Sequence, residues 1–270
     1  MNEVKFFLSL LKFAIKYPSS GLEILQTRYD VWKDSRKKIL HSFDSDCLEL
    51  NACLKTLFSN ENYSIPSFRK NTAVLNKKID DFFNFLKNKE YPSRIKPYPL
   101  FYTLDKESGF FLYSICKILK PDKVVETGVA YGLGSTFILQ ALKENQKGKL
   151  FSIDDVFRPW ESKNMIGSII PDDLKSNWEI HFGTSKNKLK SILESLGEID
   201  IFFHDSLHTS KNMLFEFNTV WPFLKKGGFL LSDDIGSNNS FYEFYSAKNV
   251  KPTILIQKKP DKSFFGILKK

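Results

Sequence analysis

A glycine-rich segment between residues 126 and 135 carries the first residue types that suggest chemistry. It has the sequence ETGVAYGLGS, starts at Glu126, and directly follows a short β-branched run. Glycines let the backbone approach a ligand closely, and the N-terminus of a following helix carries partial positive charge. The spacing G-x-x-x-G-x-G differs from the G-x-G-x-x-G fingerprint of dinucleotide-binding enzymes. Because Glu126 would repel a pyrophosphate and suits a cationic ligand, the segment disfavours a dehydrogenase.

Acidic residues also follow three later apolar runs of the chain. Asp154 ends KLFSID, Asp205 follows IDIFFH, and Asp233 and Asp234 follow GGFLLS. If these runs are parallel strands, their carboxyl ends meet at one edge of the sheet, where open α/β sheets bind ligands. Asp154 is then placed to accept hydrogen bonds from ribose hydroxyls. The other three carboxylates, at two neighbouring strand ends, would repel one another without a cation.

The elements that must position these residues alternate between strand and helix. The expected strands are 123–127, 149–153, 178–182, 200–203, 229–231, 253–258 and 264–268, and the expected helices are 108–119, 135–143, 186–196 and 212–224. This alternation implies parallel strands with right-handed helical crossovers. The last two strands, joined by the turn 260–262, are expected to form an antiparallel hairpin. We therefore predict an α/β protein with a doubly wound, mostly parallel, seven-stranded sheet.

Residues 1–97 show helical periodicity and no convincing strand. Three prolines between residues 92 and 99 cannot lie inside a helix, so we place a boundary there, between a helical region 1–97 and an α/β domain 98–270. The segment 4–15 is interrupted by Lys12 and is far shorter than the ~20 apolar residues of a membrane span. We expect an amphipathic helix here that lies on the body of the protein or on a membrane surface.

The composition is that of an ordinary globular protein with a basic balance. Hydrophobic residues make up 42% of the 270 residues, charged residues 26%, and the formal net charge is +9. The lysines are scattered and form no dense stripe with arginine, which favours a solvated basic surface over a nucleic-acid partner. The three cysteines have neither metal-ligand nor disulfide spacing, which predicts buried thiols in a reducing, cytoplasmic setting.

The motifs, in this order, resemble those of class I S-adenosylmethionine-dependent methyltransferases. VVETGVAYGLGS is similar to their first motif and KLFSIDD to their second. The stretch IDIFFHDSLHTSKNMLFEFNTVWPFLKKGGFLLSDDI resembles the later motifs of the catechol and caffeoyl-CoA O-methyltransferases and of the bacterial macrocin O-methyltransferase family. The resemblance covers residues 98–270. It implies a Rossmann-like methyltransferase fold, S-adenosylmethionine as cofactor, and methyl transfer to a hydroxyl of a small molecule, a sugar or a phenolic metabolite.

The resemblance also implies roles for individual residues. The residues implied to bind the cofactor are Glu126, Thr127, Gly128, Gly132, Gly134, Ser135, Asp154, Gly183, Ser185 and Asp205. Asp205, Asp233 and Asp234 fall on the positions that hold a divalent metal, Mg²⁺, in the catechol-type enzymes, where the last is usually asparagine. Asp205 and His208 are the implied catalytic residues, with His208 at the position of the base that deprotonates the acceptor. The metal would orient the acceptor hydroxyl and lower its pKa.

Other interpretations stay open on the sequence alone. The basic charge also fits a nucleic-acid methyltransferase, the acidic residues fit a metal-dependent hydroxylase-like relative, and the N-terminal helix fits a non-catalytic, membrane-associated binding protein with the same fold. Asp233 and Asp234 are equally compatible with a capped turn. The loop 157–171 is either a packing element or a substrate lid. The region 1–97 is expected to cover the acceptor site or to form a homodimer interface.

Overall fold

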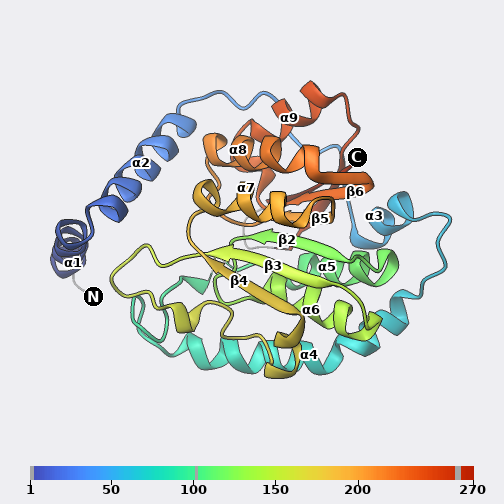
Figure 1. The fold of residues 1–270 in the computed structure, drawn as a ribbon, viewed down its shortest axis with the longest axis horizontal. Coiled ribbons are helices and arrows are strands. Elements are labelled where there is room, and N and C mark those ends of the chain that lie inside the picture. The colour runs from blue at the N-terminus through green and yellow to red at the C-terminus, as the bar shows by residue number, and fades with distance from the viewer. Residues whose placement is uncertain (1–2, 101–102, 259–262) are drawn as a thin grey trace.

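The computed structural model describes residues 3–100, 103–258 and 263–270, and its centre is one eight-stranded sheet (Figure 1). The strands are β1 (Cys47–Leu48), β2 (Lys123–Thr127), β3 (Lys149–Asp154), β4 (Trp178–Phe182), β5 (Ile199–His204), β6 (Leu224–Ser232), β7 (Thr253–Gln257) and β8 (Ser263–Lys269). Their order across the sheet is β1-β7-β8-β6-β5-β2-β3-β4. Neighbours from β4 to β6 pair in parallel, whereas β8 is antiparallel to both β6 and β7. The predicted mostly parallel sheet with a closing hairpin is confirmed; the predicted turn 260–262 lies outside the described residues.

The sheet has one strand more than the seven predicted. Cys47 and Leu48 form β1, which pairs in parallel with Ile254 and Leu255 of β7 at the edge of the sheet. The expectation of no strand in residues 1–97 was therefore wrong, because a two-residue strand leaves no alternation that a sequence pattern could detect. Cys47 lies in this strand and is half-buried, so the prediction of a buried thiol was wrong for this residue.

Three details of the predicted order also differ from the structure. Strand β6 begins at Leu224 and not at residue 229, and the helix before it ends at Val220 and not at residue 224. A further helix, α9 (Ser240–Lys248), was not predicted. It is only nine residues long, which is shorter than the window over which helical periodicity can be recognised in a sequence.

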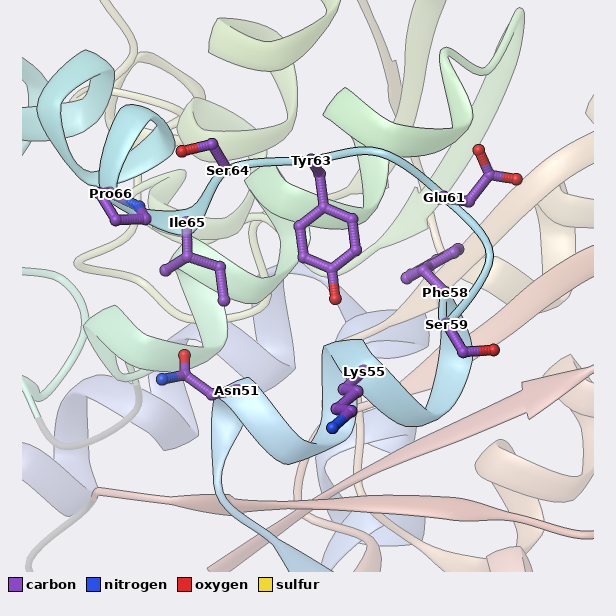
Figure 2. Close-up of a pocket in the computed structure, with 9 residues that line it drawn as sticks. All are labelled: Asn51, Lys55, Phe58, Ser59, Glu61, Tyr63, Ser64, Ile65 and Pro66. Carbon is purple, nitrogen blue, oxygen red and sulfur yellow. The ribbon is translucent and has the colours of Figure 1, made fainter.

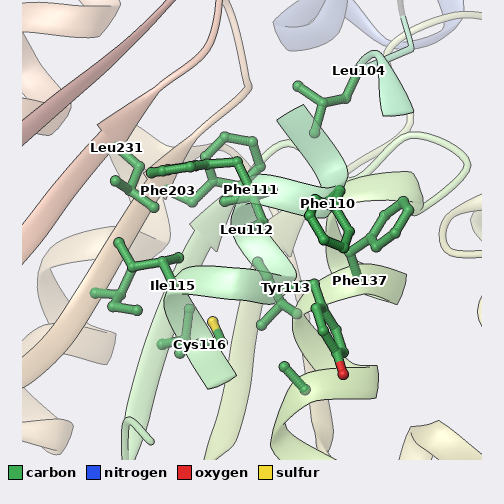
Figure 3. Close-up of a cluster of buried hydrophobic side chains, with 14 of the residues drawn as sticks. Leu104, Phe110, Phe111, Leu112, Tyr113, Ile115, Cys116, Phe137, Phe203 and Leu231 are labelled. Atoms are coloured by element: carbon green, nitrogen blue, oxygen red, sulfur yellow. The ribbon is translucent and has the colours of Figure 1, made fainter. Parts of the chain in front are cut away.

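Helices cover both faces of the sheet (Figure 1). On one face lie α4 (Ile65–Lys87), α5 (Lys106–Leu119) and α6 (Leu133–Asn145), and on the other lie α7 (Ser185–Leu196), α8 (Ser210–Val220) and α9. Each face has its own cluster of buried apolar side chains. Figure 3 shows the first cluster, where Phe110 and Phe111 of α5 lie near Phe137 of α6 and Phe203 of the sheet. Nine consecutive residues of α5, 108–116, are buried, because the helix lies between the sheet and other helices.

The N-terminal region contributes to this core and also extends beyond it. Helix α3 (Leu50–Leu57) and α4 bury apolar residues in the same cluster as α5 and α6. Before them, α1 (Glu3–Lys16) and α2 (Pro18–Ser35) form a hairpin that projects from the body beside α8 (Figure 1). Among the residues that the structure describes, none of the helices combines the length and apolarity needed to cross a bilayer.

Candidate active site

The loop that joins β2 to α6 is held in place by Asp154 at the end of β3. One carboxylate oxygen, Oδ2, accepts hydrogen bonds from the backbone N–H groups of Val129 and Ala130 at 2.9 and 2.8 Å. The other, Oδ1, accepts from the N–H of Asp155 at 2.7 Å. Burial raises the pKa of Asp154 to about 6, although these hydrogen bonds act in the opposite direction. The carboxylate thus fixes the glycine-rich loop and lies beside it, where the sequence predicted a ribose contact.

Gly128 brings this loop into direct contact with the end of β5. Its φ is +83°, and a Cβ built on it would lie 2.0 Å from the carbonyl oxygen of Asp205. The N–H of Asp205 in turn donates to the carbonyl oxygen of Thr127 at 2.8 Å. Only glycine combines this backbone conformation with this close approach. Two of the predicted functional segments, the glycine-rich loop and the Asp205 segment, are therefore neighbours in space.

Three of the predicted cofactor residues make protein contacts beneath the loop. Glu126 is buried, and its Oε2 accepts hydrogen bonds from the hydroxyls of Ser135 and Ser152, each at 2.7 Å. Burial raises the pKa of Glu126 to about 7, which the two hydroxyls partly counteract. Thr127 donates to the buried Glu216 at 2.6 Å. These side chains support the glycine-rich loop through buried hydrogen bonds. Their contact with a cofactor stays a prediction.

Gly183 and Ser185 lie at the start of α7, next to the same loop. The N–H of Gly183 donates to the carbonyl oxygen of Asp154 at 3.1 Å. The Ser185 hydroxyl donates to Asn212 Oδ1 of α8 at 3.3 Å. The turn of Gly183, which is predicted to bind the cofactor, is therefore attached to the residue predicted to bind the ribose.

The loop 157–171 forms a packed wall against the glycine-rich loop. The indole N–H of Trp160 donates to the carbonyl oxygen of Pro97 at 3.2 Å, and Trp160 is buried. The N–H of Gly167 donates to Ala130, and that of Ile169 to Tyr131, at 2.9 and 3.0 Å. These contacts fit the packing interpretation of the loop and place it as one side of the site.

Three hydroxyl oxygens around the glycine-rich loop are buried without a hydrogen-bond partner in the described part of the chain. They belong to Tyr98, Ser168 and Thr184. Tyr98 exchanges backbone hydrogen bonds with the Tyr131 hydroxyl of the loop, Ser168 adjoins Gly167, and Thr184 follows the segment bound to Asp154. A buried hydroxyl without a partner costs free energy. These three oxygens are therefore positions where a polar ligand could form a hydrogen bond.

A second group of functional side chains lies at the ends of β5 and β6. One ligand atom from each of Asp205, His208 and Asp233 lies within 4.8 Å of the others. His208 Nε2 is 4.0 Å from Asp205 Oδ1. Asp233 is almost fully buried, and its Oδ1 accepts a hydrogen bond from Gln257 Nε2 of β7 at 2.5 Å. The structure therefore brings together two of the three predicted metal ligands and the predicted base.

Asp234 is placed differently from its neighbour. It adopts the left-handed conformation, with φ +47°, and its carboxylate accepts a hydrogen bond from the hydroxyl of Ser263 at the start of β8. It does not belong to the group formed by Asp205, His208 and Asp233. A metal-binding role for Asp234 remains a prediction.

Comparison with known proteins bears on this geometry directly. Residues 125–235, from β2 to the end of β6, match a family described as "Methyltransferase domain". Residues 125–235 are therefore similar to that family, and we refer to them as the methyltransferase domain. They contain the glycine-rich loop, Asp154, Asp205, His208 and Asp233, so the two groups of functional side chains both lie inside the match. No curated protein matches the sequence.

Solved structures place this methyltransferase domain in the class I methyltransferase fold. The O-methyltransferase TomG of Streptomyces achromogenes, solved with SAM, has a TM-score of 0.53 and 17% identity, and the match covers 71% of this chain and 95% of that one. An O-methyltransferase of Bacillus cereus, solved with SAH, has a TM-score of 0.54 and 14% identity, covering 85% and 100%. The Podospora anserina methyltransferase PaMTH1, bound to SAH, has a TM-score of 0.51 and 11% identity, covering 86% and 98%. At these identities the likeness establishes the fold.

The sequence analysis missed a buried polar network that supports the methyltransferase domain. Glu216 of α8 is fully buried, and its Oε2 lies 2.6 Å from His204 Nδ1. Its Oε1 accepts hydrogen bonds from Ser206 and Asn212 at 2.8 and 3.0 Å. Burial alone would raise the pKa of Glu216, but attraction to His204 and the hydrogen bonds from His204 and Thr127 lower it to about 2. The network fixes the chain on both sides of Asp205.

A cavity of about 440 Å³ adjoins the methyltransferase domain between α4, α5 and the end of β7. Its lining residues are Asp80, Phe83, Thr103, Leu104, Asp105, Lys106, Glu107, Leu133 and Lys258. Leu133 belongs to the glycine-rich loop and its helix. Asp105 is 3.4 Å from Gln257 Nε2, which also binds Asp233. The cavity thus adjoins the start of α6 and is connected through Asp105 and Gln257 to Asp233.

A larger cavity, of about 480 Å³, lies elsewhere, between the end of α3 and the start of α4 (Figure 2). In Figure 2 the Tyr63 hydroxyl is directed toward Lys55 on α3. None of its lining residues belongs to the functional groups described above. We assign it no chemistry.

Proposed function

We propose that the protein is an S-adenosylmethionine-dependent O-methyltransferase whose acceptor is a hydroxyl of a small polar molecule. The observation that carries this proposal is the contact at Gly128, which joins the loop held by Asp154 to the segment that bears Asp205 and His208. A methyl donor on the loop and an acceptor at the acidic group would then be neighbours. The ligands of the solved neighbours, SAM and SAH, support the choice of donor.

The residues around the loop fit a cationic donor with a ribose. Asp154 places two carboxylate oxygens at the loop, and Tyr98, Ser168 and Thr184 offer buried hydroxyls without partners. Asp154 would accept hydrogen bonds from the ribose hydroxyls, and the N-terminus of α6 would face the carboxylate of the donor. When bound, S-adenosylmethionine supplies the methyl group: its carbon–sulfur bond breaks as the carbon–oxygen bond to the acceptor forms.

His208 would accept the proton of the acceptor hydroxyl. Its imidazole lies beside Asp205 and within the same group as Asp233. An imidazole near a carboxylate can take a proton at neutral pH, because its ordinary pKa lies close to the working pH. The nearby carboxylate then stabilises the imidazolium that forms, and the deprotonated oxygen becomes the nucleophile.

Asp205 and Asp233 would hold a divalent metal at this site. The chemistry of the donor set fits Mg²⁺, which is commonly bound by one or two carboxylates and completes its shell with water and substrate oxygens. A bound metal would supply positive charge that lowers the pKa of the acceptor hydroxyl. Gln257, whose amide donates to Asp233, would keep that carboxylate in position.

The cavity between α4, α5 and β7 is the proposed acceptor pocket. Its volume of about 440 Å³ lies in the range of small-molecule sites, and its lining mixes Lys106, Lys258 and Glu107 with apolar residues. It touches the donor loop through Leu133 and approaches Asp233 through Asp105 and Gln257. Charged lining residues suit a polar acceptor such as a sugar better than a flat hydrocarbon ring.

Titration calorimetry with S-adenosylhomocysteine tests the donor site. We expect Asp154→Asn to weaken binding about ten- to a hundredfold, because the amide loses the charge that strengthens hydrogen bonds to ribose. Asp173→Asn, a matched change at an exposed residue of the same domain, should leave the affinity unchanged. Equal affinities of wild type and Asp154→Asn would contradict the donor site, and absence of binding to folded wild type would contradict the proposed function.

Electron paramagnetic resonance with Mn²⁺ in place of Mg²⁺ tests the metal site independently of any acceptor. We expect wild type to bind Mn²⁺ and Asp233→Asn to weaken that binding at least about tenfold, since one of two charged ligands is lost. Asp234→Asn is the matched neighbour. Because Asp234 is bound to Ser263, this variant should keep its Mn²⁺ affinity within about threefold. If Asp234→Asn had the larger effect, the assignment of ligands would be wrong.

A further inference from the structure

The hairpin of α1 and α2 carries apolar side chains that the described part of the chain leaves uncovered. On α1, Ile15 is 72% exposed, and Leu8 and Leu11 are about half exposed. On α2, Leu22 and Leu25 are 67% and 66% exposed. Tyr29 and Trp32 continue the α2 stripe, because residues 22, 25, 29 and 32 recur every three or four positions and lie on one face of a helix. We call these seven residues the outer stripe.

Basic residues outnumber acidic ones in the segment that forms the hairpin, and two of the acidic residues contact the body. In residues 3–38 there are eight basic residues (Lys5, Lys12, Lys16, Arg28, Lys33, Arg36, Lys37 and Lys38) and four acidic ones (Glu3, Glu23, Asp30 and Asp34). Asp34 accepts a hydrogen bond from the N–H of Ser210 at 2.7 Å, and Asp30 lies 3.9 Å from Lys211, both on α8. The hairpin segment therefore combines exposed apolar side chains with a net positive charge.

The aromatic residues of the outer stripe are of the kinds found where water meets lipid. Tyr29 and Trp32 stack with ring centroids 5.8 Å apart, and the Arg36 guanidinium lies 4.2 Å from the centre of the Trp32 ring. Tyrosine, tryptophan and arginine combine an apolar body with a polar end, which suits the headgroup level of a bilayer. In the described residues, no helix could span that bilayer, so any contact would lie in its surface.

We propose that the outer stripe of the α1–α2 hairpin binds the surface of an anionic lipid bilayer. Burial of the apolar stripe and attraction of the surrounding lysines and arginines to anionic headgroups act together there. A second copy of the chain is a poorer occupant, because two stripes packed face to face would bring Lys12, Lys16 and Arg36 near their own copies. Lipid headgroups supply the opposite charge.

Flotation with phospholipid vesicles tests this proposal on the full chain. Wild type should bind vesicles that contain phosphatidylglycerol at least about tenfold more tightly than vesicles of phosphatidylcholine alone. The triple change Ile15→Gln, Leu22→Gln and Leu25→Gln should lower binding at least about tenfold, because it removes three apolar side chains from the stripe. The matched control is Val74→Gln with Phe85→Gln, two exposed apolar residues on α4, which should bind like wild type.

Three readouts make the test decisive. Circular dichroism and S-adenosylhomocysteine affinity, unchanged in the triple variant, would show that the fold and the donor site are intact. Failure of the folded wild type to bind anionic vesicles would overturn the proposal without touching the proposed methyl transfer. Sedimentation velocity that showed a wild-type dimer, dissociated by the triple change, would also overturn it, because the stripe would then pair with a second copy.

Discussion

Replacement of Gly128 by alanine is expected to abolish detectable binding of S-adenosylhomocysteine and to lower the free energy of unfolding by more than about 3 kcal/mol. The added Cβ would lie 2.0 Å from the carbonyl oxygen of Asp205 and 2.8 Å from Ser206 Cα. Both are backbone atoms, so no side-chain rotation can relieve the overlap. The chain could accept alanine only by separating the donor loop from the Asp205 segment, and that separation would open the proposed site.

Gly227 offers a matched control for this substitution. Its φ of +82° is nearly that of Gly128, and a Cβ built on it meets nothing within 4 Å. Gly227→Ala should therefore cost only the conformational strain of a left-handed alanine, about 1 kcal/mol. Urea denaturation and titration calorimetry of the two variants would separate the effect of backbone strain from the effect of steric overlap with the Asp205 segment. Similar losses of stability in both variants, with ligand affinity retained, would refute the importance of the contact with Asp205.

Glu216→Ala is expected to lower the free energy of unfolding by about 3–5 kcal/mol. The change removes the carboxylate that lies 2.6 Å from His204 Nδ1 and accepts hydrogen bonds from Thr127, Ser206 and Asn212. These polar groups would then be left in a buried place without their acceptor. Chemical denaturation at pH 7 measures the effect. Glu194→Ala on α7 is the control, since Glu194 is exposed and its pairing with Lys190 at 3.8 Å contributes little.

The stabilising effect of Glu216 should depend on pH, because its pKa is lower in the folded protein than its ordinary value. The pKa of Glu216 is lowered to about 2 in the folded protein, so its stabilising effect is fully present above its ordinary pKa. As the pH falls through that range toward about 2, the effect is lost. The difference in unfolding free energy between wild type and Glu216→Ala should therefore narrow in acid. A difference that stayed below about 1 kcal/mol at pH 7 would contradict the role of the network.

The fold was predictable from the sequence where periodicity is local and regular. The strands that end at Thr127, Asp154 and His204 are short apolar runs followed by turn residues, and each was expected within a residue of its position. Strand β1 and helix α9 were not predictable in this way. Strand β1 exists only because β7 is beside it, and that neighbour lies about two hundred residues further along the chain.

The candidate site was predictable where residues share the carboxyl ends of the strands. Asp154, Asp205 and Asp233 met this condition, because parallel strands bring their ends together whatever the loops do. Glu216 did not, since it comes from a helix. Gln257 ends β7, which runs in the same direction as β6, so it met the condition but was not among the predicted residues. A signal for Glu216 was present: it lies on the helix face of Met213, Phe217 and Val220, and an acidic residue on an apolar face needs a buried partner.

Strand β1 also has a consequence for the way the molecule meets other chains. It covers the outer edge of β7, where Ile254 and Leu255 belong to the apolar run TILIQ. An uncovered edge of this kind has unpaired backbone N–H and C=O groups. A strand of another molecule can pair with these groups and extend the sheet. Cys47 and Leu48 pair with this edge in parallel. The backbone groups of β7 that pair with β1 are therefore not available to a strand of another molecule.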